Sequence, residues 1–266
     1  MKTFPSDELF SDLFVTEVRI DKKIPSQNYL SELPVIKYLR KMESIKFNSS
    51  VTFFVGENGT GKSTLIEGIA VALGFNPEGG SKNFNFSTHN SHSDLSDYLT
   101  VCKGIKLPRD GFFLRAESYY NFASNIDDLD TDEPGAETMS SPKIINSYGG
   151  VSLHKQSHGE SFLSMVENRL GGKGIYIFDE PEAALSPARL LELMCHIDRL
   201  VKNDSQFIIA THSPILMAFP NAEIYELSEV GIRNVDYLET EHFMITKSFL
   251  NNPQKFLKEM FREDDD

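Results

Sequence analysis

One short segment of the sequence has the residue types that bind phosphate groups. Glycines stand at positions 56, 59 and 61, and the last of them is followed by Lys62 and Ser63. Glycines let a backbone curl so that successive N–H groups point inward at an anion. Lys62 would then reach the β- and γ-phosphates of a nucleoside triphosphate, and the Ser63 hydroxyl would bind Mg²⁺. The predicted phosphate-binding loop consists of Gly56, Glu57, Asn58, Gly59, Thr60, Gly61, Lys62, Ser63 and Thr64.

The residues on either side of this loop favour the structural context that it needs. Residues 51–55 are β-branched or aromatic and predict a buried strand. Apolar residues then recur at helical spacing over residues 63–73, which predicts a helix. A helix N-terminus behind a glycine turn attracts anions, because the helix dipole adds partial positive charge there. The whole segment therefore predicts a nucleotide-binding strand, loop and helix.

Acidic residues and a histidine follow two further apolar segments. Residues 175–178 form an apolar run suited to a parallel strand that is covered on both faces, and Asp179 and Glu180 come directly after it. Ligands bind at the carboxyl ends of such strands. We therefore expect Asp179 to hold Mg²⁺ and Glu180 to orient and deprotonate an attacking water. Residues 207–210 predict the next strand, and His212 after it would contact the γ-phosphate.

A helix start lies between the phosphate loop and these strands. Ser157 is a good N-cap and Glu160 follows three positions later, which is the pattern of a capping box. Apolar residues on one face then continue the predicted helix to Leu170. The stripe consists of Phe162, Met165, Val166 and Leu170.

The four motifs occur in one order: phosphate loop, Ser-x-Gly-Glu helix start, strand ending in Asp-Glu, and strand ending in Thr-His-Ser. This order resembles the ATP-binding-cassette (ABC-type) superfamily over most of residues 45–215. The resemblance implies an ATP hydrolase with a P-loop NTPase fold of the α/β class. That fold has a mainly parallel sheet flanked by helices, an N-terminal antiparallel β portion and a small helical lobe.

The same resemblance implies the ligands and the assembly. ATP and Mg²⁺ would bind between the two subunits of a head-to-tail homodimer. Ser157, Gly159 and Glu160 look like the superfamily signature, in which a helix N-terminus contacts the γ-phosphate of ATP held by the opposite subunit. Two ATP molecules would be enclosed in this way, and the dimer would open after hydrolysis.

The sequence departs from the superfamily pattern at three places. No glutamine occurs between Lys62 and Gln156, so the usual metal-contacting glutamine is missing. Glu117, at the end of a predicted strand, is the best substitute, because its carboxylate could reach Mg²⁺. His158 stands where the signature has a glycine, and Ser186 stands where an aspartate is common. These changes bear on dimer coupling and turnover and not on ATP binding.

The overall composition restricts the class of protein. The chain has 266 residues, of which 40% are hydrophobic and 24% charged, as in an ordinary soluble globular protein. A net charge of −13 argues against binding DNA through a broad basic surface, although a local basic patch would still permit it. No apolar run is long enough to span a bilayer, and residues 1–20 lack a signal-peptide pattern. We therefore expect a cytoplasmic protein without membrane insertion.

Two cysteines, Cys102 and Cys195, have no motif spacing and indicate a reducing compartment without disulfide bonds. Cys195 falls within an apolar helical pattern, which predicts an inert core position. Tyr38 or Phe47 could stack on adenine, but a core position is favoured for either residue. His89 and His92 have no acidic or thiol partner at ligand spacing, so a solvated loop is favoured there over a metal site.

We expect residues 1–266 to form a single ABC-type ATPase domain, with residues 74–156 as an inserted helical and loop lobe. Within that lobe, residues 74–111 are predicted to be a polar loop, and the acidic run at residues 127–133 predicts an exposed insertion. Other predicted strands lie at residues 15–20, 45–47, 111–117, 224–227 and 232–237, and other predicted helices start at Pro34, after Ser186 and near residue 254.

Three kinds of ABC-type ATPase fit these motifs: a transporter's nucleotide-binding subunit, a DNA-maintenance or DNA-repair ATPase, and a small stand-alone soluble ATPase. The residues that flank Asp179 and His212 are more similar to those of the soluble recombination, chromosome-cohesion and overcoming-lysogenisation ATPases than to those of transporter subunits. The segment between Lys62 and Ser157 is, however, too short for long coiled-coil arms. We favour the stand-alone ATPase, which would control an unidentified protein partner or nucleic acid, including in phage defence. A nucleotide-gated binding module with very slow hydrolysis is the non-enzymatic alternative.

Overall fold

The computed structural model describes residues 12–82, 93–117, 148, 150 and 157–261. Its centre is a six-stranded sheet with the strand order β5-β6-β7-β3-β8-β9. All neighbouring strands in it are parallel except β9, which is antiparallel to β8. The strands are β3 (Val51–Gly56), β5 (Asp110–Arg115), β6 (Gly174–Asp179), β7 (Gln206–Ala210), β8 (Glu223–Ser228) and β9 (Gly231–Asn234). The predicted α/β class with a mainly parallel sheet is therefore confirmed.

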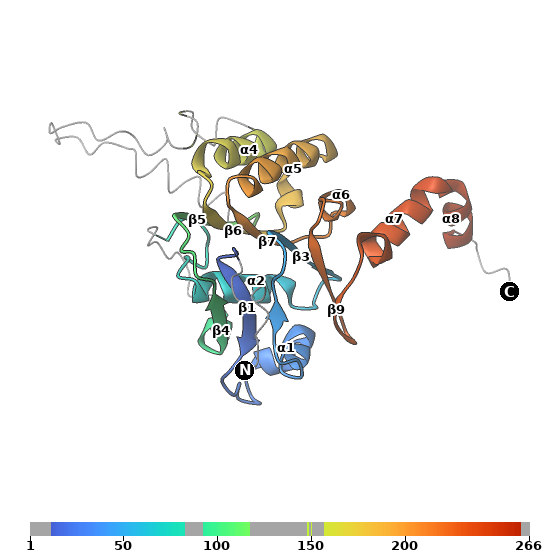
Figure 1. Ribbon diagram of the computed structural model, residues 1–266. Helices are drawn as coiled ribbons and strands as arrows, with labels where there is room; N and C mark the ends of the chain where they lie inside the picture. Colours follow the sequence, from blue (N-terminus) through green and yellow to red (C-terminus); the bar gives the residue numbers. More distant parts are fainter. Residues whose placement is uncertain (1–11, 83–92, 118–147, 149, 151–156, 262–266) are drawn as a thin grey trace, which may run out of the picture.

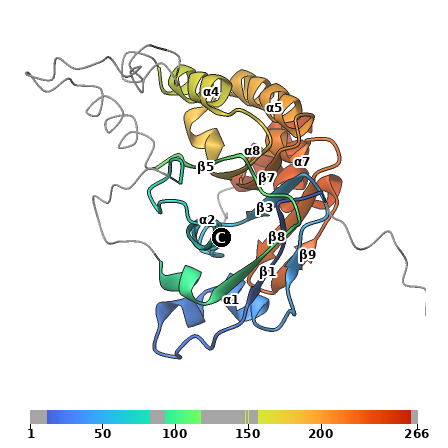
Figure 2. The same cartoon turned by 60° about the vertical axis from the view of Figure 1, so that its left-hand side comes forward.

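Helices cover both faces of this sheet (Figure 1). α4 (His158–Arg169), α5 (Pro187–Val201) and the short α6 (Pro214–Met217) lie on one face, and α2 (Lys62–Ala72) lies on the other. Figure 2 shows the two layers from a second direction. Successive side chains of β3 point to opposite faces of the sheet and belong to separate hydrophobic cores. Phe53 packs with α4 and α5, whereas Phe54 packs with α2. Burial on both faces explains why these strands are apolar throughout.

A smaller antiparallel sheet packs beside α2. It has the order β2-β1-β4 and consists of β1 (Val15–Ile20), β2 (Ile45–Lys46) and β4 (Leu99–Lys103). The buried side chain of Gln206, in β7, joins the two sheets. Its Oε1 accepts from the backbone N–H groups of Phe14 (3.0 Å) and Val15 (2.9 Å), and its Nε2 donates to the carbonyl of Val15 (2.8 Å). The predicted N-terminal antiparallel portion is confirmed.

Short helical segments connect these strands: the 3₁₀ turns η1 (Tyr29–Glu32), η2 (Asp94–Asp97), η5 (Pro181–Ala184) and η6 (Tyr237–Glu239), and the helix α1 (Pro34–Leu39). Two helices, α7 (Glu241–Asn251) and α8 (Pro253–Met260), follow the last strand and extend away from the sheets in Figure 1. Neither has a fully buried residue. Within the described ranges, none of the helices combines the length and the apolar character needed to cross a bilayer.

Several sequence predictions need correction or fall outside the described residues. Cys195 is exposed and not part of the core, because it lies on the outer face of α5. Residues 74–111 are not one polar loop, since they contain η2, β4 and the start of β5. β4 and β5 also show that part of the 74–156 segment belongs to the two sheets. His89, His92 and the acidic run at residues 127–133 lie outside the described residues.

Candidate nucleotide-binding site

The phosphate loop connects β3 to α2 and depends on its glycines. Gly56 has φ +138°, and a Cβ atom there would lie 2.0 Å from the carbonyl oxygen of Leu227 in the neighbouring strand β8. Gly61 has φ +95°, and its Cβ would lie 2.4 Å from a methyl group of Val35. Side chains at these two positions would clash as well as being strained. The loop therefore has its curled shape only with the glycines that the sequence supplies.

The ammonium group of Lys62 lies inside this curl. Its Nζ donates to the carbonyl oxygens of Gly56 (2.7 Å) and Glu57 (3.0 Å), and the residue is only 4% exposed. Burial lowers the pKa of Lys62, while the charges of Glu180 and Asp179 act in the opposite direction. A buried cation held by neutral carbonyls is well placed to bind an anion that enters the loop.

Strand register brings the other candidate residues to the same edge of the sheet. Asp179, the last residue of β6, is paired with Arg115 of β5 on one side and with Ala210 of β7 on the other. Ala210 is in turn paired with Phe54 of β3, close to the start of the phosphate loop. The carboxyl ends of four parallel strands are therefore level, and Asp179 lies beside the loop that contains Lys62.

The carboxylate of Asp179 has the features of a cation ligand. Burial raises the pKa of Asp179 to about 6, whereas the charge of Arg115 and a hydrogen bond with Ser63 act in the opposite direction. Its Oδ1 atom is buried and has no hydrogen-bond partner among the described residues. An unpaired buried oxygen beside a serine hydroxyl fits Mg²⁺, which is usually bound by one or two carboxylates together with phosphate oxygens and water. In the described part of the chain, no three His, Cys, Asp or Glu side chains form a group that could hold a metal ion.

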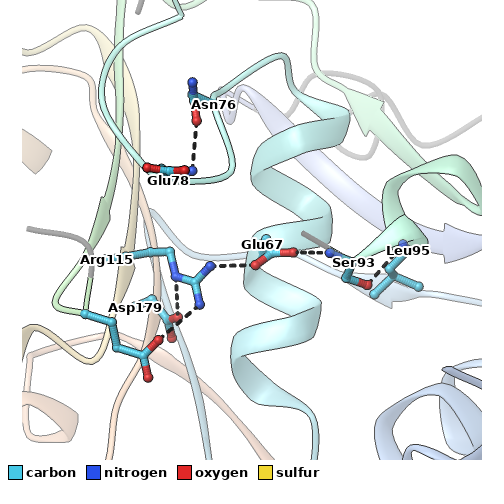
Figure 3. Close-up of polar contacts among 8 residues, drawn as sticks. Glu67, Asn76, Glu78, Ser93, Leu95, Arg115 and Asp179 are labelled. Atoms are coloured by element: carbon cyan, nitrogen blue, oxygen red, sulfur yellow. Dashed lines mark hydrogen bonds and ion pairs between the residues drawn. The ribbon is translucent and has the colours of Figure 1, made fainter. Parts of the chain in front are cut away.

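Arg115, which no sequence motif indicated, lies between Asp179 and a glutamate of α2, Glu67 (Figure 3). Arg115 Nη1 lies 2.6 Å from Oε2 of Glu67 in α2, and its Nε lies 3.7 Å from Oδ2 of Asp179. Glu117, the predicted substitute for the missing glutamine, lies at the same strand end. It contacts Arg115 at 3.4 Å through a side chain that is 85% exposed. Arg115 thus lies between the carboxylates of Glu67, Asp179 and Glu117.

Glu180 begins the turn after β6 in a conformation that few residues adopt. Its φ and ψ are 51° and 52°, the left-handed region, which is strained for a residue with a side chain. The backbone N–H of Glu180 donates to the carbonyl of Ala210 (3.0 Å), and this contact fixes the turn. Its Oε1 lies 3.5 Å from Nε2 of His212. Strained backbone of this kind is common where a side chain must be held at a functional position.

His212 is held by two residues that the sequence patterns did not indicate. Its backbone N–H donates to Oε1 of Glu182, whose pKa is raised by burial. Its ring Nδ1 lies 3.1 Å from Nε2 of His242 in α7. Burial and then the charge of Lys62 lower the pKa of His212. The only signal for His242 would have been its position at a helix start, which is too common to identify it.

The predicted signature residues form a separate group. Ser157 caps α4, and both hydrogen bonds of the predicted capping box with Glu160 are present. Gly159 lies against the turn that follows Glu180, because a Cβ there would be 3.2 Å from the carbonyl oxygen of Ala184. Ser157 and Glu160 are exposed. The helix start therefore presents its N-terminal groups to solvent and packs on the segment that carries Glu180.

Two aromatic residues were considered for stacking on adenine. Phe47 is 3% exposed and packs edge-on against Phe54, so it belongs to the core and cannot stack on a base. Tyr38 is partly exposed, and its hydroxyl donates to the carbonyl of Glu229 (2.9 Å). A pocket of about 640 Å³ borders the outer side of the phosphate loop. Its lining includes residues 56–60, the β8–β9 hairpin, and Glu241 and Met244 of α7.

Two family models match separate parts of the chain. The first, described as "AAA domain", matches residues 35–117, which include the phosphate loop. The second, described as "AAA domain, putative AbiEii toxin, Type IV TA system", matches residues 161–218, which include Asp179, Glu180 and His212. A comparison with curated protein sequences found no match.

Solved structures that resemble the chain include CbiO1 from Clostridium perfringens, part of the ABC transporter complex CbiONQ. It is 18% identical, covers 93% of this chain and 99% of its own, and has a TM-score of 0.47. A nucleotide-free ATP-binding cassette from an ABC transporter is 17% identical, with 94% and 100% coverage and a TM-score of 0.47. The SMC head domain from Thermotoga maritima is 14% identical, with 84% and 99% coverage and a TM-score of 0.42. Identities this low transfer neither a substrate nor a partner.

A glycine loop between β3 and α2, with an Asp-Glu pair at the end of a nearby parallel strand, defines the chain as a P-loop NTPase. The two AAA-domain matches, over residues 35–117 and 161–218, and the order of the motifs agree with the resemblance to ABC-type ATPases that the sequence predicts. Proteins of this kind in general bind ATP with Mg²⁺ and hydrolyse it.

Proposed function

We propose that this chain binds MgATP and hydrolyses it, and that ATP brings two copies together to control a partner protein or nucleic acid. One observation carries the proposal. Strand register brings Asp179 and Glu180, at the end of β6, level with the end of β3 that leads into the loop of Lys62, although these residues come from distant parts of the sequence. A phosphate-binding cation, a metal ligand and a base therefore surround one volume, as phosphoryl transfer to water requires.

Each residue has a distinct part in this mechanism. Lys62 and the N–H groups of residues 56–64 bind the phosphates and neutralise charge that builds up in the transition state. Ser63 and Asp179 would hold Mg²⁺, which supplies further charge neutralisation on the phosphate oxygens. Glu180 accepts a proton from the attacking water, and His212 beside it orients the water or the γ-phosphate. Glu117 is exposed and next to Arg115, so its contact with the metal depends on a change in that ion pair.

The position of the signature residues supports the proposed dimer. Ser157, Gly159 and Glu160 lie at an exposed helix start, a place where anions bind, and within the chain the N–H and hydroxyl of Ser157 donate to the carboxylate of Glu160 (3.2 and 2.7 Å). In a head-to-tail dimer, this helix start would face the phosphates bound by the other copy. The packing of Gly159 against the turn after Glu180 would then link the two sites.

The proposal is tested by measuring phosphate release and nucleotide binding together. Lys62→Ala should abolish ATP binding. Glu180→Gln should bind MgATP normally but hydrolyse it about 10²- to 10⁴-fold more slowly, because it lacks the base. Lys202→Ala is the control, since Lys202 is an exposed residue that forms an ion pair with Asp198. A wild-type protein that binds no ATP, or a Glu180→Gln variant with normal turnover, would refute the mechanism.

A further inference from the structure

The ring of His212 has different neighbours on its two sides. On one side, Nδ1 lies 3.1 Å from Nε2 of His242, and the two ring centroids are 5.2 Å apart. On the other side, Nε2 lies 3.5 Å from Oε1 of Glu180. Nε2 is buried and has no hydrogen-bond partner among the described residues. His212 therefore connects the turn after β6 to the first turn of α7.

His242 is held firmly in this position by the start of α7. Thr240 caps the helix by accepting from the N–H of Phe243 (3.4 Å), and its hydroxyl donates to the carbonyl of Tyr237 (2.9 Å). The N–H of Glu241 donates to Oε1 of the buried Glu226 (3.1 Å), whose other oxygen binds Arg233. These contacts fix the backbone on both sides of His242.

A neutral histidine carries one N–H, and the neighbours of His212 decide which nitrogen has it. If Nδ1 carried the proton, the lone pair of Nε2 would face the carboxylate of Glu180, and the two would repel each other. If Nε2 carries the proton, its N–H faces that carboxylate, and Nδ1 accepts a hydrogen bond from Nε2–H of His242. The second arrangement satisfies both contacts.

We propose that His242 is a positioning residue for the nucleotide site. Its Nε2–H donates to Nδ1 of His212 and thereby keeps the proton of His212 on Nε2, where it is available to a γ-phosphate oxygen or to the attacking water. Because a donor at this point is useful only for phosphoryl transfer, the inference rests on the proposed function. The inference assigns a residue of α7, which lies outside the four sequence motifs, to the proposed nucleotide site.

The contact between His212 and His242 depends on the position of α7. The first turn of α7 also forms part of the wall of the 640 Å³ pocket, through Glu241 and Met244, opposite residues 56–60 of the phosphate loop. α7 and α8 extend beyond the sheets and expose apolar side chains, including Met260 (68%) and Phe261 (73%). A displacement of these helices would move His242 and so change the donor that His212 presents.

The test compares His242→Phe, which keeps a ring but has no N–H donor, with His242→Gln, which keeps a donor. His196→Phe is the control, because His196 is a partly buried histidine in α5 outside this group. In full-length protein labelled with ¹⁵N-histidine, the His212 signals are assigned by their loss in His212→Gln. The spectra are recorded in the Glu180→Gln background, because the carboxylate of Glu180 also favours the Nε2–H form. We expect the Nε2–H form in this parent and with His242→Gln, and a mixture of both neutral forms with His242→Phe. An unchanged form in His242→Phe would overturn the inference, even if the protein proved to have no ATPase activity.

Turnover provides a second readout in an active enzyme. His242→Phe should lower kcat about 10- to 100-fold, the usual effect of removing a residue that orients a reactive histidine. The KM for MgATP should change by less than about twofold, because the contact matters for the reaction and not for binding. His242→Gln should recover most of kcat, and His196→Phe should match the wild type. If His242→Phe were as active as the wild type while Glu180→Gln was inactive, the inference would fail and the proposed function would stand.

Discussion

The guanidinium of Arg115 binds the carboxylate of Glu67 at 2.6 Å and so connects the end of β5 to α2. The second oxygen of Glu67 accepts the backbone N–H of Ser93 at 2.7 Å, and Arg115 also lies next to Asp179. A single buried glutamate of α2, the helix behind the phosphate loop, thus contacts both the segment at Ser93 and the end of β5 next to Asp179 (Figure 3). The paired charges are held in place by their surroundings and are costly to separate.

Glu67→Gln should lower the free energy of unfolding by about 3 kcal/mol, because it removes the nearest carboxylate from the partly buried guanidinium of Arg115. Urea denaturation measures the change. Glu192→Gln is the matched control: Glu192 binds Arg189 at 2.7 Å, but both side chains are largely exposed. Loss of this exposed ion pair should lower the free energy of unfolding by less than about 1 kcal/mol. Equal losses in the two variants would show that the Glu67 pair contributes no more than a surface ion pair.

Asp110 should make the protein sensitive to acid. Burial alone would raise the pKa of Asp110, but the N–H of Gly171 and the guanidinium of Arg169 together hold it below its ordinary value. Tyr176 also donates to its carboxylate at 2.9 Å. Since the pKa is lower in the folded than in the unfolded protein, ionised Asp110 stabilises the fold above the unfolded pKa. That contribution is lost as the pH falls through the lower, folded value.

Asp110→Asn should therefore reduce stability by about 2 kcal/mol or more at pH 7, and the difference from the wild type should shrink below about pH 4. Urea unfolding of the variant and the wild type, from pH 7 to below pH 4, measures this difference in stability. Asp198→Asn is the control, because Asp198 forms only an exposed ion pair with Lys202. A difference between Asp110→Asn and the wild type that stayed constant down to pH 2 would contradict the lowered pKa.

The motifs and the strands could be predicted from the sequence because their signals are local. Apolar runs such as residues 207–210 are buried on both faces, and the glycine spacing of the phosphate loop follows from backbone geometry. Arg115 and Glu67 could not be paired in advance, since they are 48 residues apart and meet only because α2 packs on the sheet that contains β5.

Two elements, α7 and β4, could not be predicted because they lack a clear apolar pattern. α7 has no buried residue, so it lacks the apolar stripe from which a helix is predicted. β4 has one buried residue, at Leu99, and for the same reason gave no strand pattern. His242 lies in α7. Its contact with His212 is a property of the folded chain that no local pattern indicates.

Gly61 and Gly59 should respond differently to the same substitution. Both have positive φ, +95° and +83°, so alanine at either is strained by about 1–2 kcal/mol. At Gly61 the new Cβ would also lie 2.4 Å from Val35, whereas at Gly59 it would have no atom within 4 Å. Gly61→Ala should therefore cost about 1–3 kcal/mol more in urea unfolding and weaken ATP binding more strongly. Equal stability of the two variants would indicate that Val35 moves aside freely.

ATP-dependent dimer formation is best measured in the Glu180→Gln background, where bound ATP persists. This variant should sediment as a dimer with MgATP and as a monomer without it. Adding Ser157→Ala should weaken the dimer at least about tenfold, because a hydroxyl that faces the γ-phosphate of the other copy is lost. The same change removes the N-cap of α4 and costs about 1 kcal/mol of stability.

The control for this loss of stability is Asn252→Ala, which removes a different N-cap, the one that accepts from the N–H of Lys255 at the start of α8. It should lower stability by a similar amount, about 1 kcal/mol, and leave the dimer intact. A monomer with and without MgATP would exclude the sandwich arrangement. A dimer weakened equally by both cap variants would instead assign Ser157 to the stability of α4 alone, since capping is the one function that the two residues share.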